Sequence, residues 1–313
     1  MASCMIHLYA GWLYAQKNTE FLDHPNFYLG CILPVSYTHL SHAVSLISII
    51  LCKNRGGDFM ELTWQTFAIV CPLVFLGGFM DAVAGGGGII TLPAYMFAGV
   101  PIHMAYGTNK FGNSFGTAIA TFNYGRGGFI HWKPGFVCAA MSLIGSWLGA
   151  RLVVALSAQT LQYCTTILLP AIAIFMILNR NIGKEEKAEQ TGKSLYLRSA
   201  FIGLVIGCYD GFFGPGTGTF MVMAFTSLLG YSLIRASGNA KLVNLASNIG
   251  GLIAYIYHGN VLFLLGIPAA ICSILGNYIG TKMAIKIGGK FIRPVLLTAM
   301  GLLVIKLIWD TLS

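Results

Sequence analysis

Two aspartates that precede glycine runs are the first candidates for chemistry. Asp81 stands four residues before the first glycine of a run of four: Gly85, Gly86, Gly87 and Gly88. A second aspartate has the same spacing in a second glycine-rich motif: Asp210, Gly214, Gly216 and Gly218. Such glycine runs break a helix, and the short apolar segments after them would point N–H groups and positive dipole ends at the break. This favours a bound anion, and close helix crossing through small residues is the structural alternative.

Two lysines in largely apolar segments form a second candidate group. Lys110 and Lys241 each lie three residues before an asparagine, so lysine and amide share one helix face. The polar residues around them that we assign to a substrate site are Thr108, Asn109, Asn113, Asn244 and Asn248. Ammonium and amide donors of this kind suit an oxyanion. The alternative is a lysine near the membrane interface whose head reaches out to water.

The two aspartates have a coupling or a structural role in this hypothesis. Among the acidic residues after Met60, Asp81 and Asp210 are the two that lie inside apolar segments. A charge at the centre of a bilayer costs roughly 2.5–3.5 kcal/mol, which indicates a purpose. Each could carry a coupled proton or pair with a basic residue. The structural alternative is a cap on the amides of the glycine break.

The composition is that of a protein embedded in a lipid bilayer. Of 313 residues, 56% are apolar and 9% are charged, against roughly a quarter charged in soluble proteins. The net charge of +9 is scattered at the ends of apolar runs, so it does not indicate nucleic acid. The eight cysteines form no CxxC pair, and no histidines have metal-ligand spacing. We expect no metal, no cofactor, no catalytic residue and no enzymatic activity.

Long apolar runs alternate with short polar breaks after Met60. We expect membrane segments at Trp64–Ala84, Ile89–Gly99, His103–Tyr124, Phe136–Leu156, Leu161–Leu178, Arg198–Phe213, Thr219–Leu229, Ser237–His258, Val261–Ile285 and Phe291–Trp309. The hydrophilic stretch Asn179–Leu195 separates two halves. The fold class that follows is an all-α polytopic membrane protein with glycine-broken or re-entrant helices.

The two halves are a sequence repeat. Besides the aspartate–glycine motifs, GTNKFGN at Gly107–Asn113 matches GNAKLVN at Gly238–Asn244, and IGSWLGAR at Ile144–Arg151 matches LGNYIGTK at Leu275–Lys282. The last two matches share an offset of 131 residues without a gap. Their small-xxx-small glycines indicate helix contacts. We expect residues 60–178 to form the first repeat, 179–196 a cytoplasmic loop and 197–313 the second repeat, with about five hydrophobic segments each.

The basic residues of the loops predict the topology. The central loop, the Arg126–Lys133 turn and the Lys282–Arg293 region are the richest in Lys and Arg, and all three fall on one side. An odd number of segments per repeat makes the repeats inverted. We therefore expect a multi-pass protein of the bacterial inner (plasma) membrane, with the Met60 end and the C-terminus periplasmic. This holds whether each first pair of segments makes two crossings or a re-entrant hairpin.

Residues 1–59 differ from the rest of the chain. They contain no apolar run of the roughly 20 residues that a spanning helix needs. The hexapeptide Val35–Leu40 (VSYTHL) also equals the translation of a transposon end used in sequencing libraries. Our hypothesis is that this segment is an extension from a chimeric reading frame and that the native start is Met60. A genuine extension is the alternative.

The glycine and lysine motifs resemble those of the sulfite exporter TauE/SafE family. The residues concerned are GGFMDAVAGGGGIITLPA with GTNKFGNSFGTAIATFNY, and YDGFFGPGTGTF with NAKLVNLASNIGGL in the YfcA-like branch. The resemblance covers about Glu61 to Leu312 and does not reach residues 1–59. It implies an inner-membrane permease of two repeats that moves small sulfur-containing anions.

The function we expect is secondary transport, in the direction of export, of a small oxyanion such as sulfite or an organosulfonate. The partners are that anion and the bilayer, with a homo-oligomer left open. Two alternatives remain: a membrane-embedded carrier or enzyme passing a sulfur compound to a soluble partner, and a cation transporter that uses the Asp81–Asp210 pair. From sequence alone, Lys110→Met or Lys241→Met is expected to weaken transport while stability holds or rises.

Overall fold

The computed structural model describes residues 50–53, 59–178 and 188–287. The chain divides into two units, of which Met1–Ser48 lies outside the described residues and Ile49–Ser313 holds every described element. Three predictions lie wholly or partly outside the described residues: the extension at residues 1–59, apart from 50–53 and 59, the central loop over residues 179–187, and the helix at Phe291–Trp309.

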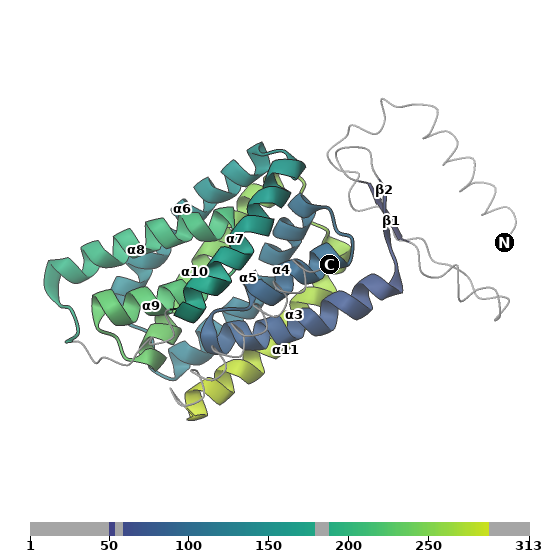
Figure 1. Cartoon of the computed structure of the whole chain (residues 1–313). Coiled ribbons are helices and arrows are strands. Elements are labelled where there is room, and N and C mark those ends of the chain that lie inside the picture. The colour runs from purple at the N-terminus through teal and green to yellow at the C-terminus, as the bar shows by residue number, and fades with distance from the viewer. Residues whose placement is uncertain (1–49, 54–58, 179–187, 288–313) are drawn as a thin grey trace, which may run out of the picture. The chain divides into compact units, whose positions relative to one another are not determined.

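The described part of the chain is helical, apart from a short ladder at its start. Strand β1 (Ile50–Lys53) pairs antiparallel with β2 (Phe59–Leu62), which the sequence analysis did not predict. Nine helices follow in the described residues (Figure 1): α3 Trp64–Ala84, α4 Gly88–Phe97, α5 Ile102–Arg126, α6 Trp132–Ala155, α7 Ala158–Leu178, α8 Gly192–Phe212, α9 Thr217–Leu229, α10 Leu233–Tyr257 and α11 Phe263–Ile287. They confirm the all-α fold class.

Helix boundaries follow the predicted segments, with one clear correction. Helix α3 has the predicted bounds, and it ends where Gly85 adopts a left-handed φ of 76°. Helix α8 begins at Gly192, so the loop predicted for residues 179–196 is too long at its C-terminal end. The sequence analysis placed the start of this helix at Arg198 because Lys193 and Arg198 lower the mean hydropathy of its first turns, whereas the rest of the helix is apolar.

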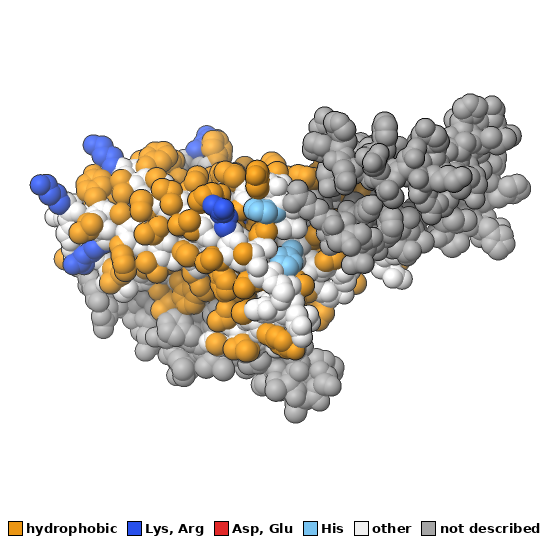
Figure 2. Space-filling view, turned by 90° about the horizontal axis from the view of Figure 1, so that it is seen from above, with side chains coloured by type: hydrophobic (Ala, Val, Ile, Leu, Met, Phe, Trp, Pro, Cys, Tyr) orange, Lys and Arg blue, Asp and Glu red, His pale blue; other side chains and the backbone are white. Residues whose placement is uncertain are grey.

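Within the described residues, four helices are long and apolar enough to cross a membrane: α3, α6, α8 and α11. Each of them exposes large hydrophobic side chains, and Figure 2 shows a face dominated by such side chains, with most of the visible Lys and Arg toward one end. Helices α5 and α10 have 25 residues each, but each buries six polar or charged side chains, among them both lysines of the candidate site. A polar helix in a membrane protein belongs inside the bundle, away from lipid.

Helices α5 and α10 lie between two glycine-rich helix pairs (Figure 1). On one side α3 packs on α11, where a Cβ on Gly276 would lie 2.2 Å from the Phe75 carbonyl oxygen. On the other side α8 packs on α6, where a Cβ on Gly149 would lie 2.2 Å from the Cys208 carbonyl oxygen. Gly149 and Gly280, which the sequence predicted as helix contacts, thus have that role: a Cβ on Gly280 would lie 2.6 Å from the Phe79 carbonyl oxygen.

The contacts between helices repeat across the two halves. The α3–α11 and α6–α8 pairs are equivalent under the sequence matches, as are the α5–α11 and α6–α10 pairs. Each half therefore packs its first helix against the other half, and the halves interlock.

The short helices α4 and α9 return alongside the helices before them. The Arg198 guanidinium near the start of α8 donates to the Leu228 carbonyl at the end of α9, at 3.0 Å. In the other half, a Cβ on Gly77 of α3 would lie 2.3 Å from the Thr91 side chain of α4. Each first pair of segments is thus an antiparallel hairpin, and α4 and α9, with 10 and 13 residues, are shorter than the roughly 20 residues that a spanning helix needs, which favours the re-entrant arrangement.

Candidate functional site

The two glycine breaks touch each other at the centre of the bundle. A Cβ on Gly85 would lie 2.2 Å from the carbonyl carbon of Gly218, and a Cβ on Gly218 would lie 2.4 Å from the Gly85 Cα. Backbone therefore meets backbone where the hairpins α3–α4 and α8–α9 cross. Any side chain at either position would overlap main-chain atoms that cannot rotate away.

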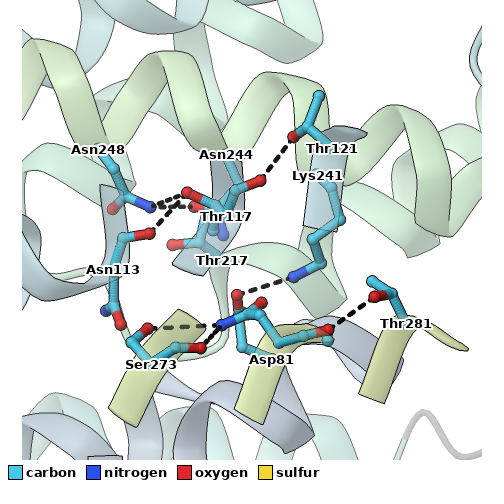
Figure 3. Close-up of polar contacts among 12 residues, drawn as sticks. Asp81, Asn113, Thr117, Thr121, Thr217, Lys241, Asn244, Asn248, Ser273 and Thr281 are labelled. Atoms are coloured by element: carbon cyan, nitrogen blue, oxygen red, sulfur yellow. Dashed lines mark hydrogen bonds and ion pairs between the residues drawn. The ribbon is translucent and has the colours of Figure 1, made fainter. Parts of the chain in front are cut away.

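Two ion pairs cross between the halves at this point. The Lys110 ammonium on α5 binds the Asp210 carboxylate on α8, and it also donates to Asn248 Oδ1 at 3.2 Å. The Lys241 Nζ on α10 lies 2.9 Å from Asp81 Oδ2 on α3 (Figure 3). The four side chains are buried, with exposed fractions of 4% for Lys110, 3% for Asp210, 1% for Lys241 and 7% for Asp81. Each lysine thus takes the aspartate of the opposite repeat.

Each aspartate is thus paired with a lysine, which is one of the roles that the sequence left open for it. The N-cap residues of α4 and α9 are Gly87 and Gly216. The buried lysines do not reach out to the interface.

The two lysines lie at opposite ends of the site. Lys110 is eight residues after Ile102, the start of α5, and Lys241 is eight residues after Leu233, the start of α10. The helices run antiparallel: the Leu262 N–H just after α10 donates to Thr108 near the start of α5, and Asn239 near the start of α10 donates to Phe129 O just after α5. The Lys110–Asp210 and Lys241–Asp81 ion pairs therefore lie at the two ends of the site along the helix axes.

A cavity of about 300 Å³, including its open mouth, lies between the ion pairs. The predicted residues that line it are Asp81, Gly85, Gly88, Asn109, Lys110, Asn113, Asp210, Gly214, Gly218, Asn244 and Asn248. They come from both glycine breaks and from α5 and α10, so the structure brings the two sequence motifs together.

Five predicted residues do not line the cavity: Gly86, Gly87, Thr108, Gly216 and Lys241. Thr108 Oγ1 accepts the Leu262 N–H at 2.9 Å, which fixes the turn between α10 and α11. Gly87 packs on the Gly77 carbonyl, Gly86 accepts the Ile89 N–H at 3.2 Å, and Gly216 starts α9 with a φ of 81°. Lys241 lies behind Asp81, with this ion pair and no hydrogen bond of good geometry in the described part of the chain.

One lining residue was not predicted. Thr217, the first residue of α9, lines the cavity, and its hydroxyl donates to the Gly214 carbonyl at 2.7 Å. Its place inside the glycine motif is the signal that could have found it, because a hydroxyl at a helix start commonly binds the local backbone.

The donors around the cavity suit a small anion. Lys110 supplies charge, while Asn113 donates to Asn109 Oδ1 at 3.1 Å and Asn248 lies within 3.5 Å of Asn244 Oδ1. Gly88 and Gly218 bring the positive ends of α4 and α9 to the same space. Among the described residues, no three His, Cys, Asp or Glu side chains gather as metal ligands would.

Comparison with known proteins places this arrangement in a family. The family model "Sulfite exporter TauE/SafE" matches residues 70–307. A probable membrane transporter protein, ORF9, of Sinorhizobium sp is 34% identical over 80% of this chain and 95% of its own length. The probable membrane transporter protein YfcA of Escherichia coli is 34% identical with the same coverage of both chains.

A more distant relative is the probable membrane transporter protein YdhB of Bacillus subtilis, 30% identical over 68% of this chain and 89% of its own length. No solved structure matches the chain. The match extends over both helical halves and both ion pairs, and the chain is a multi-pass membrane transporter that belongs to the sulfite exporter TauE/SafE family.

Proposed function

We propose that the protein is a secondary transporter of a small sulfur-containing oxyanion, such as sulfite or an organosulfonate, and that it works as an exporter across the bacterial inner membrane. The observation that carries the anion assignment is the cavity between the crossed glycine breaks, into which the Lys110 ammonium and several amides face. The family description supports the sulfur chemistry and the outward direction.

The cavity also supports a small substrate. A tetrahedral or pyramidal oxyanion needs only a few donors on several sides, which the side chains of α5 and α10 and the N-termini of α4 and α9 provide.

Two other functions are less well supported. A cation transporter would need the carboxylates of Asp81 and Asp210 as ligands, but both already bind ammonium groups. A carrier or enzyme that passes a sulfur compound to a soluble partner would release new chemical species. The relatives are named transporters.

Binding of the anion is expected to raise the melting temperature of the purified protein. A ligand at a hundredfold excess over its dissociation constant stabilises the native state by about 2.7 kcal/mol. Sulfite, sulfate, thiosulfate, sulfoacetate and taurine should be compared in a thermal-shift assay with the chloride salt as control. A shift with choline or alkali cations and none with any anion would favour the cation transporter.

We propose further that Asp210 carries a proton with the anion. An oxyanion at Lys110 takes the place of the Asp210 carboxylate, which is then a buried charge without a partner. Protonation removes that cost. Besides Lys110, the Tyr209 and Tyr255 hydroxyls interact with this carboxylate, and the Asp81 carboxylate lines the same cavity. Anion and proton would therefore bind together.

Asp210→Asn is expected to remove the pH dependence of anion binding. Methanesulfonate is a suitable probe because it stays a monoanion, so that only the protein titrates. In the wild type, binding is expected to take up a proton, so the affinity should rise as the pH falls. In Asp210→Asn the affinity should be constant, and the anion should stabilise the variant more than the wild type, since Lys110 lacks its carboxylate.

Asp81→Asn is the matched control. Its partner Lys241 does not line the cavity, so the pH dependence should persist. Wild-type anion affinity that does not change with pH would exclude proton coupling at this site. If the pH dependence were lost in Asp81→Asn and kept in Asp210→Asn, Asp81 and not Asp210 would be the residue that carries the proton.

The orientation in the membrane is a separate prediction. In the described residues, the Phe129–His131 turn is hydrogen-bonded to Asn239 near the start of α10. The start of α5 is hydrogen-bonded to the turn between α10 and α11. The predicted topology places the two members of each pair on the same side of the membrane. We propose that the Phe129–His131 turn is cytoplasmic and the termini at Met60 and Ser313 periplasmic. Alkaline phosphatase fused within Lys184–Lys193 should be inactive, and the same enzyme after Ser313 should be active; the opposite pattern would contradict the orientation.

A further inference from the structure

Two cysteines from different halves of the chain meet between α3 and α11. Cys71 on α3 and Cys272 on α11 are half-buried, and their side chains lie against each other, close enough for the two thiols to interact. The equivalent positions of the α8–α6 pair hold Ala200 and Met141. The two thiols are therefore a feature of one helix pair and not of the repeat.

Close packing of the two helices holds the thiols together. Helices α3 and α11 lie side by side (Figure 1). A Cβ on Gly276 would lie 2.2 Å from the Phe75 carbonyl oxygen, and a Cβ on Gly280 would lie 2.6 Å from the Phe79 carbonyl oxygen one turn later on both helices. The helices thus run parallel with their backbones in contact, and the two cysteines stand one turn before the first of these contacts. A disulfide needs its two Cα atoms within roughly 7 Å of each other, and such packing favours that spacing.

A buried hydroxyl beside the thiols has no hydrogen-bond partner. Tyr95 on α4 is fully buried and lies close to both Cys71 and Cys272, but its hydroxyl makes no hydrogen bond to the described residues. The residue that faces this hydroxyl on α5 is Gly112, where an added Cβ would lie 3.6 Å from it. Buried polar atoms are normally satisfied by protein or by water. The unpartnered hydroxyl therefore indicates a place for a small polar molecule beside the two sulfur atoms.

A bond between these cysteines would join a wall of the cavity to a helix behind it. Helix α3 contributes Asp81 and Gly85 to the cavity lining, whereas no described residue of α11 lines the cavity. Helix α3 belongs to the first half and α11 to the second. Transporters with inverted repeats work by movement of one repeat against the other. A covalent link between α3 and α11 would oppose such movement.

We infer that Cys71 and Cys272 are a redox-sensitive pair, in which a peroxide closes a disulfide that holds the α3–α4 hairpin against α11 and stops transport. The effect on transport rests on the proposed function, whereas formation of the disulfide does not. The oxidant is a small neutral hydroperoxide such as hydrogen peroxide, which can reach half-buried thiols inside a bilayer.

The chemistry takes two steps and needs one peroxide. In the first step one sulfur attacks a peroxide oxygen, the O–O bond breaks, and a sulfenic acid and a water molecule form. In the second step the other sulfur attacks the sulfenic sulfur, the S–S bond forms, the S–O bond breaks, and the oxygen leaves as water with the thiol proton. The two sulfurs together lose two electrons, and hydrogen peroxide becomes two water molecules.

Peptide mapping and flux measured on the same proteoliposomes test this inference. The full chain is treated with hydrogen peroxide, its remaining thiols are blocked with N-ethylmaleimide, and disulfide-linked peptides are identified by mass spectrometry. Uptake of radiolabelled methanesulfonate is measured before oxidation, after oxidation and after treatment with dithiothreitol. Methanesulfonate is the probe because sulfite itself is a nucleophile that cleaves disulfides.

The expected result is a peptide linked through Cys71 and Cys272, with uptake lower by about tenfold or more and restored by dithiothreitol. The melting temperature of the oxidised protein should not fall, because a cross-link constrains the unfolded chain. Cys71→Ala and Cys272→Ala should transport at the wild-type rate before and after peroxide. Cys208→Ala is the matched control: it removes a half-buried thiol from α8, and it should respond to peroxide as the wild type does.

Three results would overturn the inference: no linked peptide in the folded protein, linked protein that transports at the reduced rate, or an equal loss of uptake in Cys71→Ala. Reduced wild-type protein that moves neither methanesulfonate nor sulfite would contradict the proposed function instead. The peptide map would in that case still decide whether the two thiols form a disulfide.

Discussion

Lys110→Met is expected to abolish anion transport and to destabilise the protein. The ammonium of Lys110 is the positive side-chain charge that faces the cavity, and methionine of similar length offers no donor. The substitution also leaves the Asp210 carboxylate buried at 3% exposure without a partner, and breaking a buried pair costs about 3–5 kcal/mol. The measurement is anion uptake in proteoliposomes beside the melting temperature in detergent.

This prediction replaces the expectation from sequence that stability would hold or rise. That expectation treated the lysine as an isolated buried charge whose removal relieves desolvation. The structure shows a partner, so removal of one charge exposes the other to the same penalty.

Lys110→Met/Asp210→Asn is the control that separates transport from folding. With both charges gone, no buried charge lacks a partner, and the melting temperature should return toward that of the wild type. Transport should remain absent. A double variant that is stable and still moves the anion at the wild-type rate would remove Lys110 from the substrate site.

Gly85→Ala is expected to prevent formation of the native bundle. The new Cβ would lie 2.2 Å from the Gly218 carbonyl carbon, and Gly85 has a φ of 76°, where residues other than glycine are strained. Overpacking usually costs about 1–3 kcal/mol, and here the atoms that must move belong to the backbone of both hairpins. We expect little monodisperse protein in size-exclusion chromatography and no transport.

Gly99→Ala serves as the reference for the backbone term alone. Gly99 has a nearly equal φ of 78°, but no atom lies within 4 Å of its added Cβ. The left-handed conformation should cost roughly 1–2 kcal/mol, so this variant should fold and transport. Equal behaviour of Gly85→Ala and Gly99→Ala would show that the hairpin contact is not tight.

Much of the fold could be predicted because it depends on local patterns. The apolar run at Trp64–Ala84 and the glycines after it set the bounds of α3 directly. The glycine spacing on α6 and α11 correctly indicated close helix contacts, since small residues are what such contacts need. The residues of the site could be found for a similar reason: acidic and basic groups inside apolar segments are rare enough to stand out.

The partners of these groups could not be predicted from one half of the repeat. Lys110 and Asp210 are 100 residues apart, and their contact depends on the crossing of two hairpins from different halves. The matched positions Asp81 with Asp210 and Lys110 with Lys241 were visible, but sequence spacing cannot tell a pair within a repeat from a pair across repeats. The position of Lys241 behind Asp81, outside the cavity lining, likewise follows only from packing.

Counterflow of radiolabelled sulfite in sealed proteoliposomes tests the central claim most directly. Vesicles loaded with unlabelled sulfite should transiently accumulate the external label above equilibrium, without ATP and without chemical change of the label, and vesicles with Lys110→Met/Asp210→Asn should not. The experiment is repeated with methanesulfonate, and with a monovalent cation as the opposing case. Label that accumulates for neither anion while the wild-type protein is folded, or accumulation of the cation alone, would contradict an oxyanion transporter.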